Sequence, residues 1–128
     1  TSAQATIGAG TDTLRGFENI IGSDFNDILI GSSLANTLEG GAGNDTLDGG
    51  LGVDVFIYNQ TDFGADIIKY FQNGMDKLQF NSLLADSIYD FSLTGNGTNS
   101  VLLMLGGDSI QLTSTSSFTL SADDFVFF

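Results

Sequence analysis

The chain has 128 residues, the length of one domain, and it carries 16 acidic residues against 3 basic ones, for a net charge of −13. A surface this negative repels nucleic acids and anionic lipids and attracts cations. Cysteine and histidine are absent, which excludes disulfides, thiolate metal sites and histidine-based catalysis. No apolar run approaches the roughly 20 residues of a membrane-spanning helix.

In chain order, the first predicted elements are nine-residue repeats. Four contiguous copies cover 22–30, 31–39, 40–48 and 49–57, and an outlying copy covers 7–15. A six-residue segment, 16–21, breaks the phase between them. The sixth position of the contiguous copies holds a carboxylate or its amide, and the eighth holds a large apolar residue. These two series are Asp27, Asn36, Asp45 and Asp54, and Leu29, Leu38, Leu47 and Phe56.

Each repeat divides into a six-residue turn and a three-residue strand, so two repeats make one full coil. Stacked coils form two parallel sheets that enclose the eighth-position residues, because alternate strand residues point to opposite faces. Stacked turns bring Asp27 beside Asp45, and Asn36 beside Asp54. Their carboxylates repel unless a cation lies between them. Carboxylates and main-chain carbonyls are all hard oxygen ligands, which favour Ca²⁺ over the strictly octahedral Mg²⁺.

After about Val53 the pattern changes to short β-type runs separated by glycine and asparagine turn signals. The runs cover 53–58, 66–71, 76–80, 89–93, 100–105, 108–112 and 123–128, with one helical turn expected over 82–86. We expect an antiparallel β meander over 58–128 that caps the repeats of 1–57 within one structural domain. The predicted fold class is therefore all-β, a short parallel β-roll (a right-handed solenoid) with an antiparallel cap.

The glycine-aspartate repeats resemble those of the RTX family of bacterial secreted proteins, whose nonapeptides bind calcium in a parallel β-helix. The runs 66–71 and 76–80 and the ending LSADDFVFF also resemble the C-terminal regions of RTX proteases, lipases, alginate epimerases and adhesins. In that family one ion lies between turns 18 residues apart. The lower turn supplies carbonyls from positions two and four, the upper turn from positions one and three, and each supplies its sixth-position side chain.

The resemblance implies two main calcium sites. The first comprises Ser23, Phe25, Asp27, Gly40, Ala42 and Asp45. The second comprises Ser32, Leu34, Asn36, Gly49, Leu51 and Asp54. We expect the second to bind more weakly, because Asn36 is uncharged and Leu34 replaces a glycine. A lower site would join Gly8, Gly10 and Asp12 to Gly22, Asp24 and Asp27. At the upper end, Gly41, Gly43 and Asp45, or Gly50, Gly52 and Asp54, have no following repeat, and Asp62 or Asp66 is expected to substitute.

The function that the resemblance implies is a non-catalytic calcium-binding module that folds on binding calcium outside the bacterial cell. Its implied partners are a fused N-terminal passenger and the type I secretion machinery, with no nucleic acid and no membrane insertion. The ending Asp123–Phe128 resembles an uncleaved type I secretion signal, and its alternative is a last β-strand. Two other functions stay open: an accessory polysaccharide-binding module of the alginate-epimerase type, and a structural piece of an adhesin or surface layer. The charge of −13 disfavours an acidic polysaccharide unless bound calcium bridges it.

Overall fold

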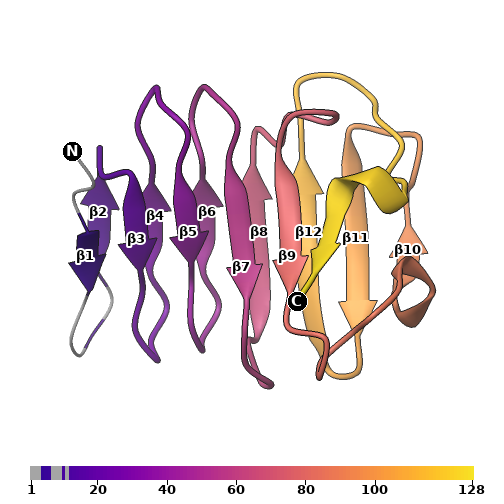
Figure 1. Ribbon diagram of the computed structural model, residues 1–128, viewed down its shortest axis with the longest axis horizontal. Helices are drawn as coiled ribbons and strands as arrows, with labels where there is room; N and C mark the ends of the chain where they lie inside the picture. The colour runs from indigo at the N-terminus through magenta and orange to yellow at the C-terminus, as the bar shows by residue number, and fades with distance from the viewer. Residues whose placement is uncertain (1–3, 7–9, 11) are drawn as a thin grey trace.

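The computed structural model describes residues 4–6, 10 and 12–128, and its strands form two facing β-sheets (Figure 1). The strands in chain order are β1 (Gln4–Thr6), β2 (Thr13–Arg15), β3 (Asn19–Ile21), β4 (Ile28–Ile30), β5 (Thr37–Glu39), β6 (Thr46–Asp48), β7 (Val55–Tyr58), β8 (Ala65–Lys69), β9 (Lys77–Phe80), β10 (Ser92–Thr94), β11 (Ser100–Leu105), β12 (Asp108–Thr113) and β13 (Phe125–Phe127).

Strands of the repeats alternate between the two sheets, so each pair of repeats makes one coil. One sheet has the order β1-β3-β5-β7-β9-β13, and the other has the order β10-β11-β12-β8-β6-β4-β2. The repeat strands pair in parallel, with Leu29 opposite Leu47 and Leu38 opposite Phe56. This is the parallel β-roll that the nine-residue period predicts.

The eighth-position residues form the core between the sheets, as predicted. Leu29, Leu38, Leu47 and Phe56 are each at most 1% exposed. The six-residue segment 16–21 does not disturb this stack, because Ile20 of β3 pairs opposite Leu38 and is itself buried. The phase break therefore shortens one turn and leaves the strand register intact.

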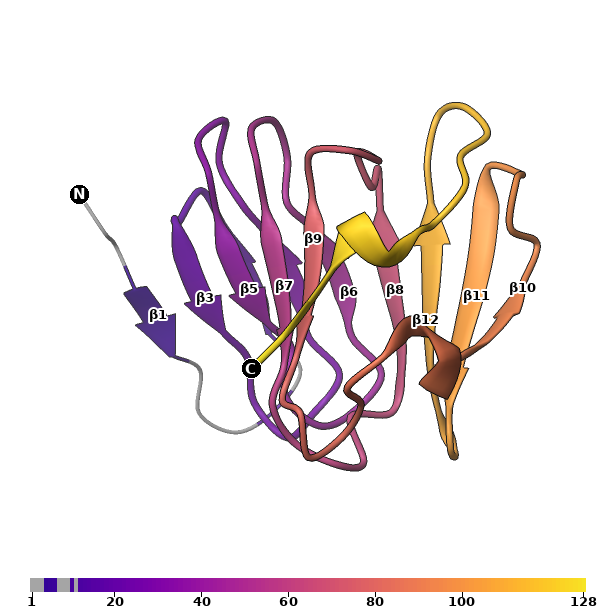
Figure 2. The same ribbon diagram turned by 45° about the vertical axis from the view of Figure 1, so that its right-hand side comes forward.

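Parallel pairing continues past residue 57. Strand β8 pairs in parallel with β6 and with β12, and β9 pairs in parallel with β7 and with β13. Antiparallel pairing is confined to β10, β11 and β12, at the end of the roll opposite the N-terminus (Figure 2). The antiparallel cap is thus β10–β12 and not the whole of 58–128, because β8, β9 and β13 pair only in parallel. A turn signal such as Asn73-Gly74 reverses the chain, but it does not fix which sheet the next strand enters.

Aromatic side chains fill the core of the second half. Phe80 stacks on Tyr58 with ring centroids 5.1 Å apart, and it packs against Phe91 and Phe125. Phe128, at the end of the chain, is 47% exposed. The expected helical turn near 82–86 is a hydrogen-bonded turn that begins at Asn81. The only helices of the described residues are two 3-10 turns, Ile88–Asp90 and Ala122–Asp124. None of the described helices has the length and apolar character needed to cross a membrane.

Candidate calcium-binding turns

The sixth-position residues form one row along each turn edge of the roll. On one edge, the backbone N–H of Asp27 donates to Oδ1 of Asp45 over 2.8 Å. On the other, the N–H of Asn36 donates to Oδ1 of Asp54 over 2.9 Å. Both pairs are 18 residues apart. Each carboxylate is therefore held by the backbone of the turn one coil earlier, which fixes the direction of its second oxygen.

The second oxygens of Asp45 and Asp54 are buried and lack a hydrogen-bond partner among the described residues. The two residues are 1% and 0% exposed. Burial raises the pKa of each carboxyl to about 6, although the backbone N–H bond opposes the shift. An unpaired buried carboxylate is strongly unfavourable, and a bound cation is one way to satisfy it.

Glycines at the first position of each repeat leave the space into which these oxygens point. A Cβ built on Gly40 would lie 2.3 Å from Oδ2 of Asp45, and one on Gly49 would lie 2.2 Å from Oδ2 of Asp54. A Cβ on Gly22 would lie 2.1 Å from the Gly40 carbonyl oxygen and 3.0 Å from Oδ2 of Asp27. Any side chain at these positions would occupy the place where oxygens of neighbouring turns converge.

The structure brings residues of the first predicted site together in two stacked turns. The Gly40 carbonyl oxygen and Oδ2 of Asp27 converge next to Gly22. The carbonyl oxygens of Ser23 and Phe25 face the upper turn. They lie 2.2 Å and 2.8 Å from the Cβ positions of Gly41 and Gly43, respectively. Ala42 belongs to the same upper turn. The Ser23 N–H and hydroxyl both donate to Oδ2 of Asp27, at 2.7 Å and 2.8 Å.

The second predicted site repeats this geometry with one less charge. The Ser32 and Leu34 carbonyl oxygens lie 2.3 Å and 2.8 Å from the Cβ positions of Gly50 and Gly52. Oδ1 of Asn36 and the carbonyl oxygen of Gly49 each lie 2.4 Å from the Cβ position of Gly31. The Asn36 amide nitrogen donates to the Phe17 carbonyl and the Ser32 hydroxyl. Leu51, in the upper turn, has an exposed side chain.

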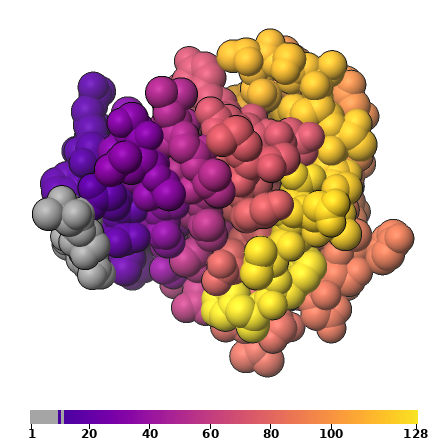
Figure 3. Space-filling view, turned by 45° about the horizontal axis from the view of Figure 1, so that its top comes forward, coloured from indigo at the N-terminus to yellow at the C-terminus, as the bar shows by residue number. Residues whose placement is uncertain are grey.

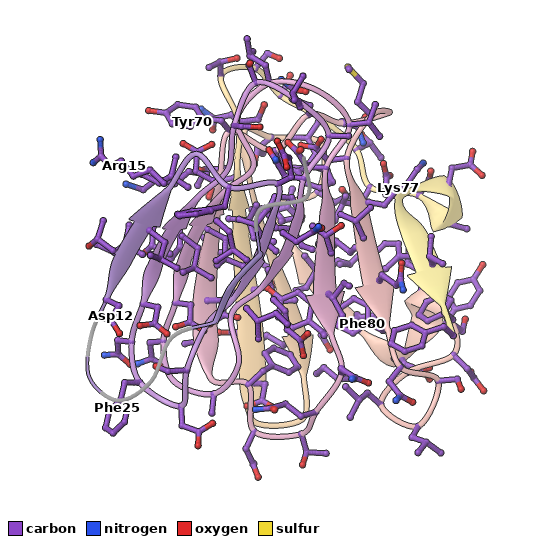
Figure 4. The ribbon with its side chains drawn as sticks, turned by 60° about the vertical axis from the view of Figure 1, so that its left-hand side comes forward. Asp12, Arg15, Phe25, Tyr70, Lys77 and Phe80 are labelled. Carbon is purple, nitrogen blue, oxygen red and sulfur yellow. The ribbon has the colours of Figure 1, made fainter. Side chains whose placement is uncertain are left out.

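At the N-terminal end, Asp12 joins the row of Asp27. Its N–H donates to Oδ1 of Asp27 over 3.0 Å, with a spacing of 15 residues because segment 16–21 is short. The Gly10 carbonyl accepts a hydrogen bond from the Ser23 hydroxyl. Gly8 lies outside the described residues, and Asp24 is exposed. Figure 4 shows Asp12 and Phe25 at this turn edge and Tyr70 at the opposite one.

Two residues, Asp62 and Asp66, were expected to complete the upper end of the repeats. Of these, Asp66 continues the row of Asp27 and Asp45. Its Oδ1 accepts the N–H of Asp45 over 2.9 Å, whereas Asp62 is exposed. On the other edge, Oδ1 of Asp76 accepts the N–H of Asp54 over 3.0 Å. Sequence reasoning missed Asp76, although an aspartate directly before the β-run 77–80 was the available signal.

These turns fit a hard cation with oxygen ligands. Among the described residues no three acidic side chains gather closely enough to hold a metal by themselves. A site on this roll must therefore combine one or two carboxylates with main-chain carbonyls. Such a set matches Ca²⁺, which accepts six to eight oxygens in flexible geometry.

Comparison with known proteins agrees with this geometry. Residues 21–56 match the model of the RTX calcium-binding nonapeptide repeat (4 copies). The fold is similar to part of the extracellular lipase LipA of Serratia marcescens, with a TM-score of 0.77 and 28% identity over 96% of this chain. The match identifies residues 21–56 as RTX calcium-binding nonapeptide repeats, and the chain as a whole has a β-roll fold similar to that part of the lipase. The chain spans 20% of the lipase.

Two modules of a mannuronan C5-epimerase from Azotobacter vinelandii have a similar β-roll fold. The AlgE6R2 subunit has a TM-score of 0.69 and 23% identity, covering 99% of this chain and 92% of the module. The AlgE6R3 subunit has a TM-score of 0.54 and 24% identity, covering 94% and 80%. No curated protein sequence matches the chain significantly. These structural relatives are modules of larger proteins.

Proposed function

We propose that the RTX β-roll binds calcium at two sites between stacked turns. The first uses the carboxylates of Asp27 and Asp45 with the carbonyls of Ser23, Phe25, Gly40 and Ala42. The second uses Asp54 and the Asn36 amide oxygen with the carbonyls of Ser32, Leu34, Gly49 and Leu51. The observation that carries the proposal is the unpaired, buried Oδ2 of Asp45 and of Asp54, each directed into space that a glycine leaves open.

Binding at these sites is coupled to folding. Without calcium, buried carboxylates lie stacked along both turn edges of a chain with a net charge of −13, and 17 glycines lose much backbone entropy on folding. A ligand that binds only the folded state stabilises it by about 2.7 kcal/mol per site at 100 times its Kd. Two such sites together contribute about as much as the whole stability of a marginal domain, roughly 5 kcal/mol.

This coupling suits a module that leaves the cell unfolded. In the low-calcium cytoplasm the chain stays competent for type I export, and outside the cell calcium folds it and supports a fused N-terminal passenger. The ending Asp123–Phe128 serves as the uncleaved secretion signal while the chain is unfolded. Support for this dual use comes from β13, which pairs with β9 only, at the sheet edge. The module itself is non-catalytic, and the parent protein carries any activity.

Calorimetric titration of the chelator-treated protein tests calcium binding directly. We expect calcium to bind with measurable affinity, and Mg²⁺ at the same concentration to compete poorly. Asp45→Asn keeps the oxygen that accepts the Asp27 N–H but removes the charge, so it should weaken binding at least tenfold. Asp86→Asn removes an exposed carboxylate outside the repeats and is the matched control. Equal affinity in Asp45→Asn and wild type would disprove the assignment.

Polysaccharide binding is the second candidate, and an open groove of about 470 Å³ favours it. Tyr70, Gln72, Asn73 and the hydroxyl-rich loop 114–117 line this groove. In Figure 3 the loop projects at the top of the molecule. No lysine or arginine lines the groove, so a neutral sugar stacked on Tyr70 fits its chemistry better than an acidic one. Titration of wild type and of Tyr70→Ala, each with neutral oligosaccharides and with alginate, distinguishes binding of a neutral sugar from binding of an acidic one. Binding of neither sugar would eliminate this candidate.

A further inference from the structure

The chain has two asparagine–glycine pairs, Asn73-Gly74 and Asn96-Gly97, and both lie in exposed turns. In such a pair the backbone nitrogen of the glycine can attack the side-chain amide carbon of the asparagine, because glycine has no side chain to hinder the approach. An N–C bond forms, the C–N bond of the amide breaks, and the backbone proton leaves with the ammonia. Water then opens the resulting succinimide ring to aspartate or isoaspartate. The rate depends on how each turn holds the two reacting groups.

The attacking nitrogens of the two pairs differ in their hydrogen bonds. The Gly97 N–H donates to the Phe118 carbonyl over 2.9 Å, so its proton is held by the fold. The Gly74 N–H has no acceptor among the residues that the structure describes. A Cβ on Gly74 would meet nothing within 4 Å, so hydroxide can reach this N–H from solvent. The nitrogen must lose its proton in order to attack, which favours reaction at the first pair.

The side-chain amides of the two pairs are also held differently. Asn96 is held at both ends, because its Oδ1 accepts the Leu120 N–H over 2.8 Å and its Nδ2 donates to the Leu120 carbonyl over 3.4 Å. Asn73 is held through its nitrogen alone, which donates to Oδ1 of Asp124 over 3.0 Å and to the Thr119 carbonyl over 3.4 Å. The oxygen of this amide has no partner among the described residues, so its carbonyl carbon can turn towards the next backbone nitrogen.

The Asn73 amide also links its turn to the 3-10 turn Ala122–Asp124. Asp124 is 2% exposed, and its Oδ1 accepts this one hydrogen bond within the described part of the chain. Its Oδ2 accepts the Ser121 N–H over 2.8 Å. Deamidation replaces the amide donor by a second carboxylate that faces a buried one, and two like charges this close repel each other. Strand β13 follows directly after Asp124 and pairs with β9 at the sheet edge (Figure 1), so it depends on this link.

We propose that Asn73 is a site of spontaneous deamidation, and that its conversion to aspartate or isoaspartate weakens the hold of the fold on its C-terminal strand. The reaction takes water as its only reactant and releases ammonia, so it is a one-way change of the folded protein with age. A second side-chain bond, from Nζ of Lys77 to the Asp123 carbonyl, ties the same 3-10 turn to β9 and stays. The last strand therefore loosens while the rest of the domain keeps its fold.

Peptide mass spectrometry of the whole chain, stored in mildly alkaline buffer with calcium, tests the modification. We expect Asn73 to deamidate about five times faster than Asn96 or more, the factor that one net hydrogen bond of about 1 kcal/mol corresponds to. In denaturant the two rates should become similar, because both turns are then open. Equal rates at the two sites in the folded protein, or a ratio that denaturant leaves unchanged, would overturn the proposal.

Hydrogen exchange of the β13 amides tests the consequence, with Asn73→Asp as the product and Asn96→Asp as the matched control. Asn73→Asp should speed exchange at 125–127, and Asn96→Asp should leave it unchanged. The double variant Asn73→Asp/Asp124→Asn exchanges donor and acceptor across the same link, so it should restore slow exchange. Unchanged exchange in Asn73→Asp, or no recovery in the double variant, would show that this link does not hold the last strand.

Discussion

Replacing Gly41 by alanine should damage calcium binding more than the same change at Gly74, although both glycines have a positive φ, of 97° and 84°. Alanine in the left-handed region costs about 1–2 kcal/mol at either position. At Gly41 the new Cβ also lies 2.2 Å from the Ser23 carbonyl oxygen, whereas at Gly74 nothing lies within 4 Å. Displacing a packed backbone group adds about 1–3 kcal/mol.

The assay is calorimetric calcium titration together with thermal unfolding, for both variants, in calcium and in chelator. Gly74→Ala should lower the melting temperature by about 4–8 °C, at roughly 4 °C per kcal/mol, and leave calcium affinity unchanged. Gly41→Ala should destabilise further and weaken calcium binding, because the displaced Ser23 oxygen is a proposed ligand. Equal calcium affinities in the two variants would refute the placement of this carbonyl in the first site.

Three further changes probe the carboxylates and the core. Asp54→Asn should raise the melting temperature in chelator, because an unpaired buried charge disappears, and lower it relative to wild type in calcium; a decrease in both conditions would contradict this. In chelator, the free energy of unfolding should fall as the pH rises from 4 to 8. Burial raises the pKa of Asp45 to about 6 and of Asp66 to about 8, so over this interval the folded state binds more protons than the unfolded state. Calcium affinity should rise over the same interval, as pH-dependent calorimetry would show. Leu38→Ala, at a fully buried position, should cost about 2–5 kcal/mol in denaturant unfolding of the calcium-bound protein.

The core of the repeats could be predicted from the sequence because one apolar residue recurs at a fixed position of every repeat. A nine-residue unit with a three-residue strand leaves one inward position, so Leu38 and Leu47 had to face each other across the roll. The same phase argument placed Asp27 next to Asp45 and Asn36 next to Asp54. Their N–H to carboxylate bonds show that the stacking argument was right about neighbours.

Sequence reasoning was least specific where the spacing departs from the period: it named Asp12 for a lower site and Asp62 or Asp66 for the upper end, and it missed Asp76. Asp12, Asp66 and Asp76 join the rows at spacings of 15, 21 and 22 residues. Their turns differ in length, but the strands after them keep the same register. Alignment by the nine-residue period detects only residues at equal sequence spacing. Hydrogen bonding between turns instead requires that the residues occupy equivalent positions in the stacked coils. Likewise, local turn signals did not show that β8 and β9 continue the parallel stack.

The central claim is that calcium binding to the glycine-lined turns drives folding of the roll. Far-ultraviolet circular dichroism of the whole chain, recorded in chelator and then during a calcium titration, tests it most directly. The account predicts a weakly structured spectrum in chelator, a cooperative gain of β-structure as calcium is added, and its loss when chelator is returned. Identical β-content and melting temperature in calcium and in chelator would contradict it.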